Sequence, residues 1–201
     1  MKWNELAKKT SVDKTIAALK ANNIEAVFVS TGAEAKKKVL EIIPAGAEVM
    51  NMTSVTLDTI GVPKELNESG KFNSVRNKLM DKTVSAREKK RLGAAPEWTV
   101  GSVHAVTENG EVLIASNTGS QLPAYAYGAD HVIWVVGTQK IVKDKEAGKK
   151  RIYDYVLPLE SERAKKAYGV PGSAVNKMLI VNKEVTPGRI TMILVGEVLG
   201  F

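Results

Sequence analysis

The sequence predicts an α/β fold: a three-layer arrangement in which a mostly parallel sheet carries helices on both faces and an inserted β-hairpin. Three observations lead to this class. Strand-like runs alternate with helical patterns in the first half of the chain, which is typical of a parallel sheet. Residues 131–136 form a nearly unbroken apolar run, as central strands do. Asn109-Gly110 separates two apolar runs, which is a strong hairpin signal.

The first part of the chain has the pattern of a helix followed by two strand–turn–helix units. Residues 10–13 resemble a capping box that begins a helix, and this helix is expected to end at residues 22–23. Strands are expected at 24–29 and 48–52, each followed by a hydroxyl-rich turn and a helix. Residues 62–91 are polar and predict two or three short helices with loops.

The second part predicts the hairpin and the remaining strands. Residues 99–106 alternate as one strand and are expected to pair with residues 112–115 across the Asn-Gly turn, because both turn residues tolerate positive φ. Residues 143–168 are charged and helical in pattern, and Pro158 is expected to split them into two helices. Further strands are expected at 131–136, 178–181 and 190–195.

Length and composition indicate one domain over residues 1–201, with a helical segment at 1–23 and an α/β core at 24–201. Of the residues, 44% are hydrophobic and 25% charged, so a buried core is expected. No segment reaches the roughly 18 consecutive apolar residues of a membrane span, and the first residues lack an apolar leader. We therefore expect a cytoplasmic protein without a membrane span.

The chain contains no cysteine and only two histidines. It therefore has no disulfide and no thiolate nucleophile, and it cannot supply cysteine ligands to zinc or to an iron–sulfur cluster. No group of histidines and carboxylates has the spacing of metal ligands. Neither a metal site nor a bound cofactor is predicted.

The formal net charge of +7 and the isoelectric point of about 9.4 suit an anionic partner. Most of the lysines and arginines lie in helix-like runs beside acidic residues, which is typical of solvated helix faces. No zinc-finger or RNA-binding aromatic motif accompanies them, so nucleic acid is not expected as the partner. A small anionic ligand, either a carboxylate or a phosphate ester, fits the charge.

Ligands of parallel α/β sheets bind beyond the carboxyl ends of the strands, where hydroxyl and backbone N–H groups can meet anionic oxygens. Three turns of this chain place small and hydroxyl-bearing residues there, and a lysine follows a further strand. Plain helix capping, and a solvent-exposed lysine, explain the same residues and stay open as alternatives. The candidate ligand-binding residues are Ser30, Thr31, Gly32, Ser54, Thr56, Asn109, Gly110, Asn117, Thr118, Gly119 and Lys140.

Glu108 is the candidate catalytic residue, because it lies at the predicted hairpin tip. A carboxylate there can act as a general base, as a nucleophile toward an activated acyl group or as an acceptor for a substrate hydroxyl. A surface turn acid is the alternative, and it stays open. His104 is interpreted as a half-buried histidine bonded to backbone, and His131, at the start of an apolar strand, as structural.

Several short motifs follow one another between about Ile24 and the C-terminus. They are Ser54-Val55-Thr56-Leu57 with Ile60-Gly61, Thr107-Glu108-Asn109-Gly110-Glu111-Val112-Leu113-Ile114, Asn117-Thr118-Gly119, His131-Val132-Ile133-Trp134-Val135-Val136-Gly137, Lys140-Ile141-Val142 and Glu197-Val198-Leu199-Gly200-Phe201. This succession resembles the LUD domain (formerly DUF162) of lactate-utilisation proteins, in which an E-T/N-G turn, a small-residue loop, an apolar strand and a K-I-V segment occur in this order.

The resemblance implies a fold similar to the NagB/RpiA/CoA-transferase superfamily. Within it, Thr107-Glu108-Asn109-Gly110 is similar to the S-E-N-G loop of CoA transferases, whose glutamate forms an acyl-CoA thioester intermediate; here Thr replaces Ser and the paired second half is lacking. The resemblance also implies a ligand-binding or accessory subunit for the use of L-lactate, a 2-hydroxy acid, beside iron–sulfur and oxidase subunits. The alternative is an enzyme that handles acyl-CoA or sugar phosphates with Glu108. The oligomeric state is not predicted.

Overall fold

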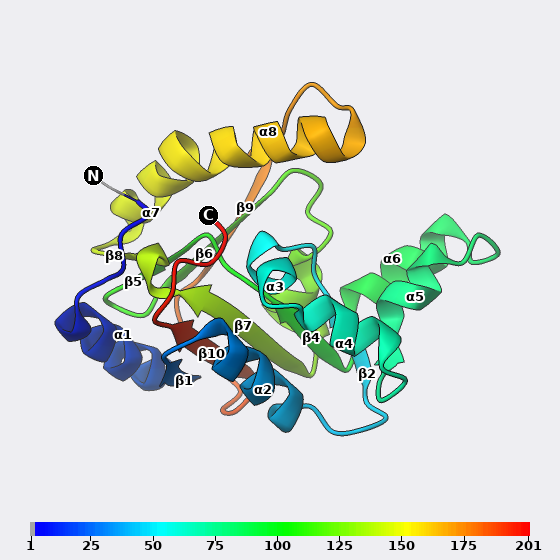
Figure 1. The fold of residues 1–201 in the computed structure, drawn as a ribbon, viewed down its shortest axis with the longest axis horizontal. Helices are drawn as coiled ribbons and strands as arrows, with labels where there is room; N and C mark the ends of the chain where they lie inside the picture. Colours follow the sequence, from blue (N-terminus) through cyan, green and yellow to red (C-terminus); the bar gives the residue numbers. More distant parts are fainter. Residues whose placement is uncertain (1–2) are drawn as a thin grey trace.

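The main sheet has six strands in the order β1-β10-β7-β4-β2-β3 in the computed structural model, which describes residues 3–201 (Figure 1). All of its strand pairs are parallel, so the carboxyl ends of the strands lie along one edge. The predicted parallel α/β architecture is confirmed. The strands are β1 (Ile24–Val29), β10 (Ile190–Val195), β7 (His131–Gly137), β4 (Trp98–Gly101), β2 (Glu48–Asn51) and β3 (Asn73–Ser74).

Both faces of this sheet are buried, as the apolar run at 131–136 predicts. Side chains of β7 alternate between two cores, with Trp134 in one and Val135 in the other. The first core includes Leu19 of α1 (Lys9–Ala21) and Ile114, and the second includes Leu57. The helices that cover the second face are α2 (Gly32–Ile42), α3 (Val55–Thr59) and α4 (Val62–Glu68).

A second, mixed sheet packs on the first face in the order β8-β5-β6-β9. The predicted hairpin is confirmed, since Ala105 pairs antiparallel with Leu113. Of the two turn residues, Gly110 has positive φ, at 81°, and its N–H donates to the carbonyl of Thr107, whereas Asn109 does not adopt the positive φ that it tolerates. The strands are β8 (Ile141–Val142), β5 (Ala105–Thr107), β6 (Val112–Ser116) and β9 (Lys177–Val181).

The single strand predicted at 99–106 is two strands in two sheets. Trp98–Gly101 pairs with β2 and β7 in the main sheet, whereas Ala105–Thr107 pairs with β6 and β8. Residues 102–104 carry the chain from one sheet to the other. Alternation reports the period of a strand and not its partner, which is why the change of sheet is invisible in the sequence.

The helical prediction for 143–168 needs one correction. The chain stays helical from α7 (Lys145–Arg151) through a π-helical turn, Ile152–Val156, into α8 (Leu157–Tyr168). Pro158 lies in the first turn of α8 and does not interrupt the helix. The π turn shifts the backbone hydrogen bonds by one residue just before the proline, which lacks an N–H to donate.

The first helix also begins differently from the prediction. Lys8 is the N-cap of α1 and makes no side-chain cap, so the capping box at 10–13 was wrong. Asp13 instead accepts a hydrogen bond from Lys9 at 2.6 Å. Asn22 ends the helix, as predicted.

The polar segment at 62–91 contains short helices, as predicted, together with the two-residue strand β3, which was missed. After α4 come α5 (Val75–Met80) and α6 (Ala86–Ala94), which pack on each other at the end of the molecule away from α1 (Figure 1). Among the described residues, no helix is long and apolar enough to cross a membrane.

Candidate functional site

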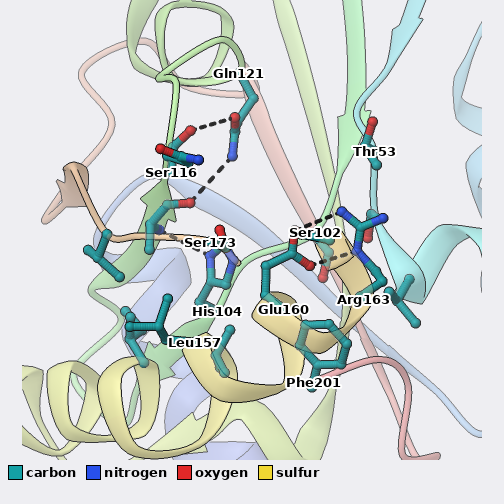
Figure 2. Close-up of a pocket in the computed structure, with 18 of the residues that line it drawn as sticks. Thr53, Ser102, His104, Ser116, Gln121, Leu157, Glu160, Arg163, Ser173 and Phe201 are labelled. Atoms are coloured by element: carbon teal, nitrogen blue, oxygen red, sulfur yellow. Dashed lines mark hydrogen bonds and ion pairs between the residues drawn. The ribbon is translucent and has the colours of Figure 1, made fainter. Parts of the chain in front are cut away.

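A cavity of about 450 Å³ lies at the carboxyl ends of β2 and β4, where the main sheet meets the second sheet and α8 (Figure 2). Residues 52–56 line it after β2, and residues 102–104 line it after β4. Residues 115–121 and α8 close the remaining sides. The cavity therefore occupies the sheet edge at which parallel α/β proteins bind ligands.

Lys140 is the buried cation of this cavity, with 2% of its surface exposed. Its ammonium donates to the Thr56 hydroxyl at 3.0 Å and to the Ser102 hydroxyl at 3.2 Å. Burial, and then the nearby Arg151, lower the pKa of Lys140 to about 7. Within residues 3–201, hydroxyls rather than carboxylates are the partners of this ammonium.

The other cation on the cavity wall is already paired. Arg163 of α8 donates twice to the Glu160 carboxylate, at 2.7 Å each, and its guanidinium lies 5.3 Å from the centre of the Tyr168 ring. The hydrogen bonds to Glu160 raise the pKa of Arg163. Of the two described lysine or arginine side chains that line the cavity, Lys140 is therefore the one that lacks a carboxylate partner.

His104 is a neutral hydrogen-bond donor on the same wall. Its Nδ1 accepts the backbone N–H of Ala115 at 3.1 Å, so the hydrogen of the neutral ring resides on Nε2. Burial, and then the cations Lys140 and Arg151, lower the pKa of His104 to about 3. The predicted half-buried, backbone-bonded histidine is confirmed.

Polar side chains from several elements complete the cavity wall. Ser116 at the end of β6 donates to the amide oxygen of Gln121 at 3.0 Å, and the Tyr125 hydroxyl lies against the backbone of residues 101–102. Burial raises the pKa of Tyr125, so its phenol is protonated. The hydroxyls and amides on the wall can donate to the oxygens of an anion. They belong to Thr53, Ser54, Thr56, Ser102, Ser116, Asn117, Thr118, Ser120, Gln121, Tyr125 and Ser173.

The structure brings five of the predicted site residues to this cavity: Ser54, Thr56, Asn117, Thr118 and Lys140. Ser54 also caps α3, and Thr56 also donates to the carbonyl of Leu199 at 3.1 Å. Gly119 lines a neighbouring cavity of about 590 Å³ instead. Two of the three predicted turns therefore meet Lys140 at one place.

The remaining turn, at residues 30–32, lies outside the cavity. Thr31 forms a capping box with Glu34 at the start of α2, and the Ser30 N–H donates to the Glu34 carboxylate at 2.7 Å. The Gly32 N–H donates to the Glu197 carboxylate at 3.0 Å. Carboxylates of the chain itself thus occupy the amides that an external anion would need.

The hairpin tip lies against α1, away from the cavity. The Glu108 carboxylate accepts from Lys14 at 3.0 Å, and hydrogen bonds from Ser11 and Lys14 lower its pKa. Asn109 accepts from the side chain of Asn22, and Gly110 approaches the backbone of α1. The structure does not bring Glu108, Asn109 or Gly110 together with Lys140.

Some cavity residues carry no sequence signal that marks them. Glu160, Arg163, Tyr168 and Ser173 come from α8 and the segment after it, which the charge pattern presents as an ordinary solvated helix.

His131 stacks on Trp98 with ring centres 4.1 Å apart, as a packing residue does. In residues 3–201, no three His, Cys, Asp or Glu side chains are grouped so as to hold a metal ion.

Comparison with known proteins agrees with this architecture. The chain is similar to the crystal structure of a DUF162 family protein from Deinococcus radiodurans, with a TM-score of 0.56 and 12% sequence identity over 95% of this chain and 99% of that one. Likeness at this identity shows the fold alone. No curated protein matches the sequence. A family model described as the LUD domain matches residues 12–195, and the chain therefore belongs to the LUD domain family.

Proposed function

We propose that this chain binds a small carboxylate of the 2-hydroxy acid type in the cavity at Lys140 and serves as a ligand-binding or accessory subunit in the use of L-lactate. The observation that carries the proposal is the buried Lys140 ammonium, which has hydroxyl partners and, among residues 3–201, no carboxylate partner.

Electrostatics favours an anionic ligand at this place. A buried cation without a counter-charge is costly, and a ligand carboxylate beside Lys140 offsets that cost. The Ser102 hydroxyl accepts from the ammonium and keeps its own hydrogen for the same carboxylate. The neutral Nε2–H of His104 adds a donor that suits a substrate hydroxyl or carbonyl oxygen.

The link to lactate rests on the family resemblance and extends to partner subunits. The chain contains no cysteine with which to ligate an iron–sulfur cluster, so cluster and oxidase subunits would carry the electrons. The kinship with the NagB/RpiA/CoA-transferase superfamily is part of the same proposal. The cavity, at about 450 Å³, is larger than a three-carbon acid requires, so longer 2-hydroxy acids belong in any test.

Substitution of Lys140 by methionine is expected to weaken carboxylate binding by roughly tenfold to hundredfold, because a hydrogen bond to a charged group contributes roughly 1.5–3 kcal/mol. Calorimetry and thermal-shift assays with L-lactate, longer 2-hydroxy acids, acetate and sugar phosphates measure the effect. Lys166→Met, which removes an exposed lysine of α8, is the matched control. Equal affinity in both variants, or no binding of any carboxylate to the unchanged chain, would contradict the proposal.

Binding should also weaken as the pH rises. The pKa of Lys140 in the free protein is about 7, and an anion favours its protonated form. The affinity for a carboxylate that stays ionised is therefore expected to be constant below about pH 6 and to fall above about pH 7, by up to about tenfold per pH unit. Calorimetry from pH 6 to pH 9 checks this. An affinity independent of pH would place the anion elsewhere.

A further inference from the structure

We propose that Lys140 forms a covalent imine with the carbonyl carbon of a 2-oxo acid, the oxidised counterpart of the ligand class proposed above, on which this inference rests. The geometry points to it. A primary amine lies at the wall of a cavity large enough for such an acid, and within residues 3–201 it has hydroxyl rather than carboxylate partners.

The absence of a carboxylate partner matters for reactivity. A carboxylate beside a lysine stabilises the ammonium, which has no lone pair to attack a carbonyl group. Thr56 and Ser102 hold Nζ in place through hydrogen bonds that a neutral amine can also make. The position of the amine therefore does not depend on its charge.

The proton balance agrees with this geometry. Burial lowers the pKa of Lys140 to about 7, so roughly half of the molecules carry the neutral amine at neutral pH, compared with about one in several thousand for a lysine in water. Desolvation of this kind is one way in which proteins make a lysine nucleophilic. Other lysines, such as Lys36 and Lys145, form ion pairs with glutamates instead.

The step balances without an oxidant or a reductant. The Nζ lone pair attacks the carbonyl carbon of the 2-oxo acid, and one proton passes from Nζ to the carbonyl oxygen to give a carbinolamine. The hydroxyl takes a second proton from the solvent, the C–O bond breaks to release water, and a C=N bond remains whose nitrogen keeps its last proton as a protonated imine. The Ser102 hydroxyl contacts Nζ and is placed to pass a proton, whereas the Thr56 hydroxyl donates to the carbonyl of Leu199 and only accepts from Nζ.

The charge of the product suits this cavity, because the one side-chain carboxylate on its described wall, Glu160, is paired with Arg163 and leaves Lys140 without a counter-charge. A protonated imine of a 2-oxo acid carries its positive charge beside the carboxylate of the same ligand. The ligand thereby provides the counter-charge that the wall around Lys140 lacks. A simple aldehyde would not, so 2-oxo acids are the preferred class.

Reductive trapping tests the proposal directly. The full chain is incubated with pyruvate and cyanoborohydride, and intact-mass and peptide-mass spectrometry locate the product. One reduced adduct is expected, on the peptide that contains Lys140, and its yield should rise between about pH 6 and about pH 8 as the amine loses its proton. L-lactate, which has no carbonyl group to attack, should give no adduct and should slow trapping by competition.

Two variants sharpen the result. Lys140→Met should abolish the adduct while thermal unfolding confirms that the chain is folded, and Lys166→Met should leave the adduct unchanged. Mapping on the unchanged chain keeps the test decisive even if Lys140→Met fails to fold.

The outcomes separate this inference from the proposed function. If L-lactate and pyruvate shift the melting temperature but no adduct forms, the imine is overturned and carboxylate binding stands. Adducts spread evenly over exposed lysines would also overturn it. If neither acid nor any longer analogue binds and no adduct forms, both proposals fail.

Discussion

Lys140→Met is expected to stabilise the fold by about 1–4 kcal/mol at neutral pH, even as it weakens ligand binding. Methionine has nearly the length of lysine without its charge, and replacement of buried charges by apolar residues of similar volume often stabilises proteins. Lys140 has 2% of its surface exposed and no carboxylate partner among the described residues, so the folded state carries most of the penalty of burying it.

The stability gained by Lys140→Met should depend on pH between about 7 and 10.5. Burial lowers the pKa of Lys140 from its ordinary 10.5 to about 7, so the unfolded chain binds more protons than the folded chain between these values. The stability of the unchanged chain therefore rises with pH across that window, and the advantage of the methionine variant shrinks. Urea unfolding of both proteins from pH 6 to pH 10 measures the difference. If the free energies of unfolding of the two proteins change with pH in parallel, Lys140 is not the source of the pH dependence.

His104 provides an internal check on this experiment. Its pKa falls from 6.5 to about 3 on folding, so both proteins should lose stability as the pH falls through that range. The charge of Lys140 contributes to this lowering, so the loss should be smaller in the methionine variant than in the unchanged chain. A trade-off between stability and function predicts such a residue: it destabilises the fold, it serves binding, and its substitution restores stability.

Gly110→Ala is expected to destabilise the protein by about 2–4 kcal/mol. Gly110 has a φ of 81°, which L residues rarely adopt, and an added Cβ would lie 2.7 Å from the carbonyl carbon of Ala18 and 2.8 Å from its oxygen. Both the strain and the clash with the backbone of α1 oppose the alanine. Thermal and urea unfolding measure the loss.

Gly70→Ala is the matched control for this substitution. Gly70 has a similar φ of 72°, but nothing lies within 4 Å of the position that a Cβ would take. Its loss should be about 1–2 kcal/mol, which is the strain alone. If Gly110→Ala and Gly70→Ala lower the free energy of unfolding equally, the contact between the hairpin tip and α1 adjusts to the added methyl group at no cost. In that case the contact does not hold the second sheet in place.

The strands of this fold that have a regular apolar pattern could be predicted from the sequence, because their buried positions follow that pattern. β7 is buried on both faces and is apolar at nearly every position, β10 lies beside it, and β1 lies on the far side of β10. The turn at Gly110 could be predicted as well, since a glycine there serves a backbone requirement that is local. The pairing of strands that are far apart in the sequence could not be predicted, because nothing in residues 102–104 indicates that the chain leaves one sheet for another.

The residues of the candidate site could be predicted from the sequence only where they follow the end of a strand. Thr56 and Lys140 follow parallel strands, so their meeting at one sheet edge follows from the architecture. Arg163 and Tyr168 reach the cavity because α8 packs over that edge, and such packing depends on tertiary contacts that have no local pattern. Residues 30–32 carry the same hydroxyl-rich signal as residues 54–56, yet Glu34 and Glu197 occupy their amides.

The wall of the cavity belongs to two sheets that have separate hydrogen-bond networks. Ser102 stands at the edge of the main sheet, Ser116 ends a strand of the second sheet, and Arg163 comes from the helix beside it. A ligand in the cavity can therefore contact both sheets and α8 at once. An occupant that touches both sides acts as a non-covalent bridge, and the rigidity of the whole molecule becomes linked to the concentration of its ligand.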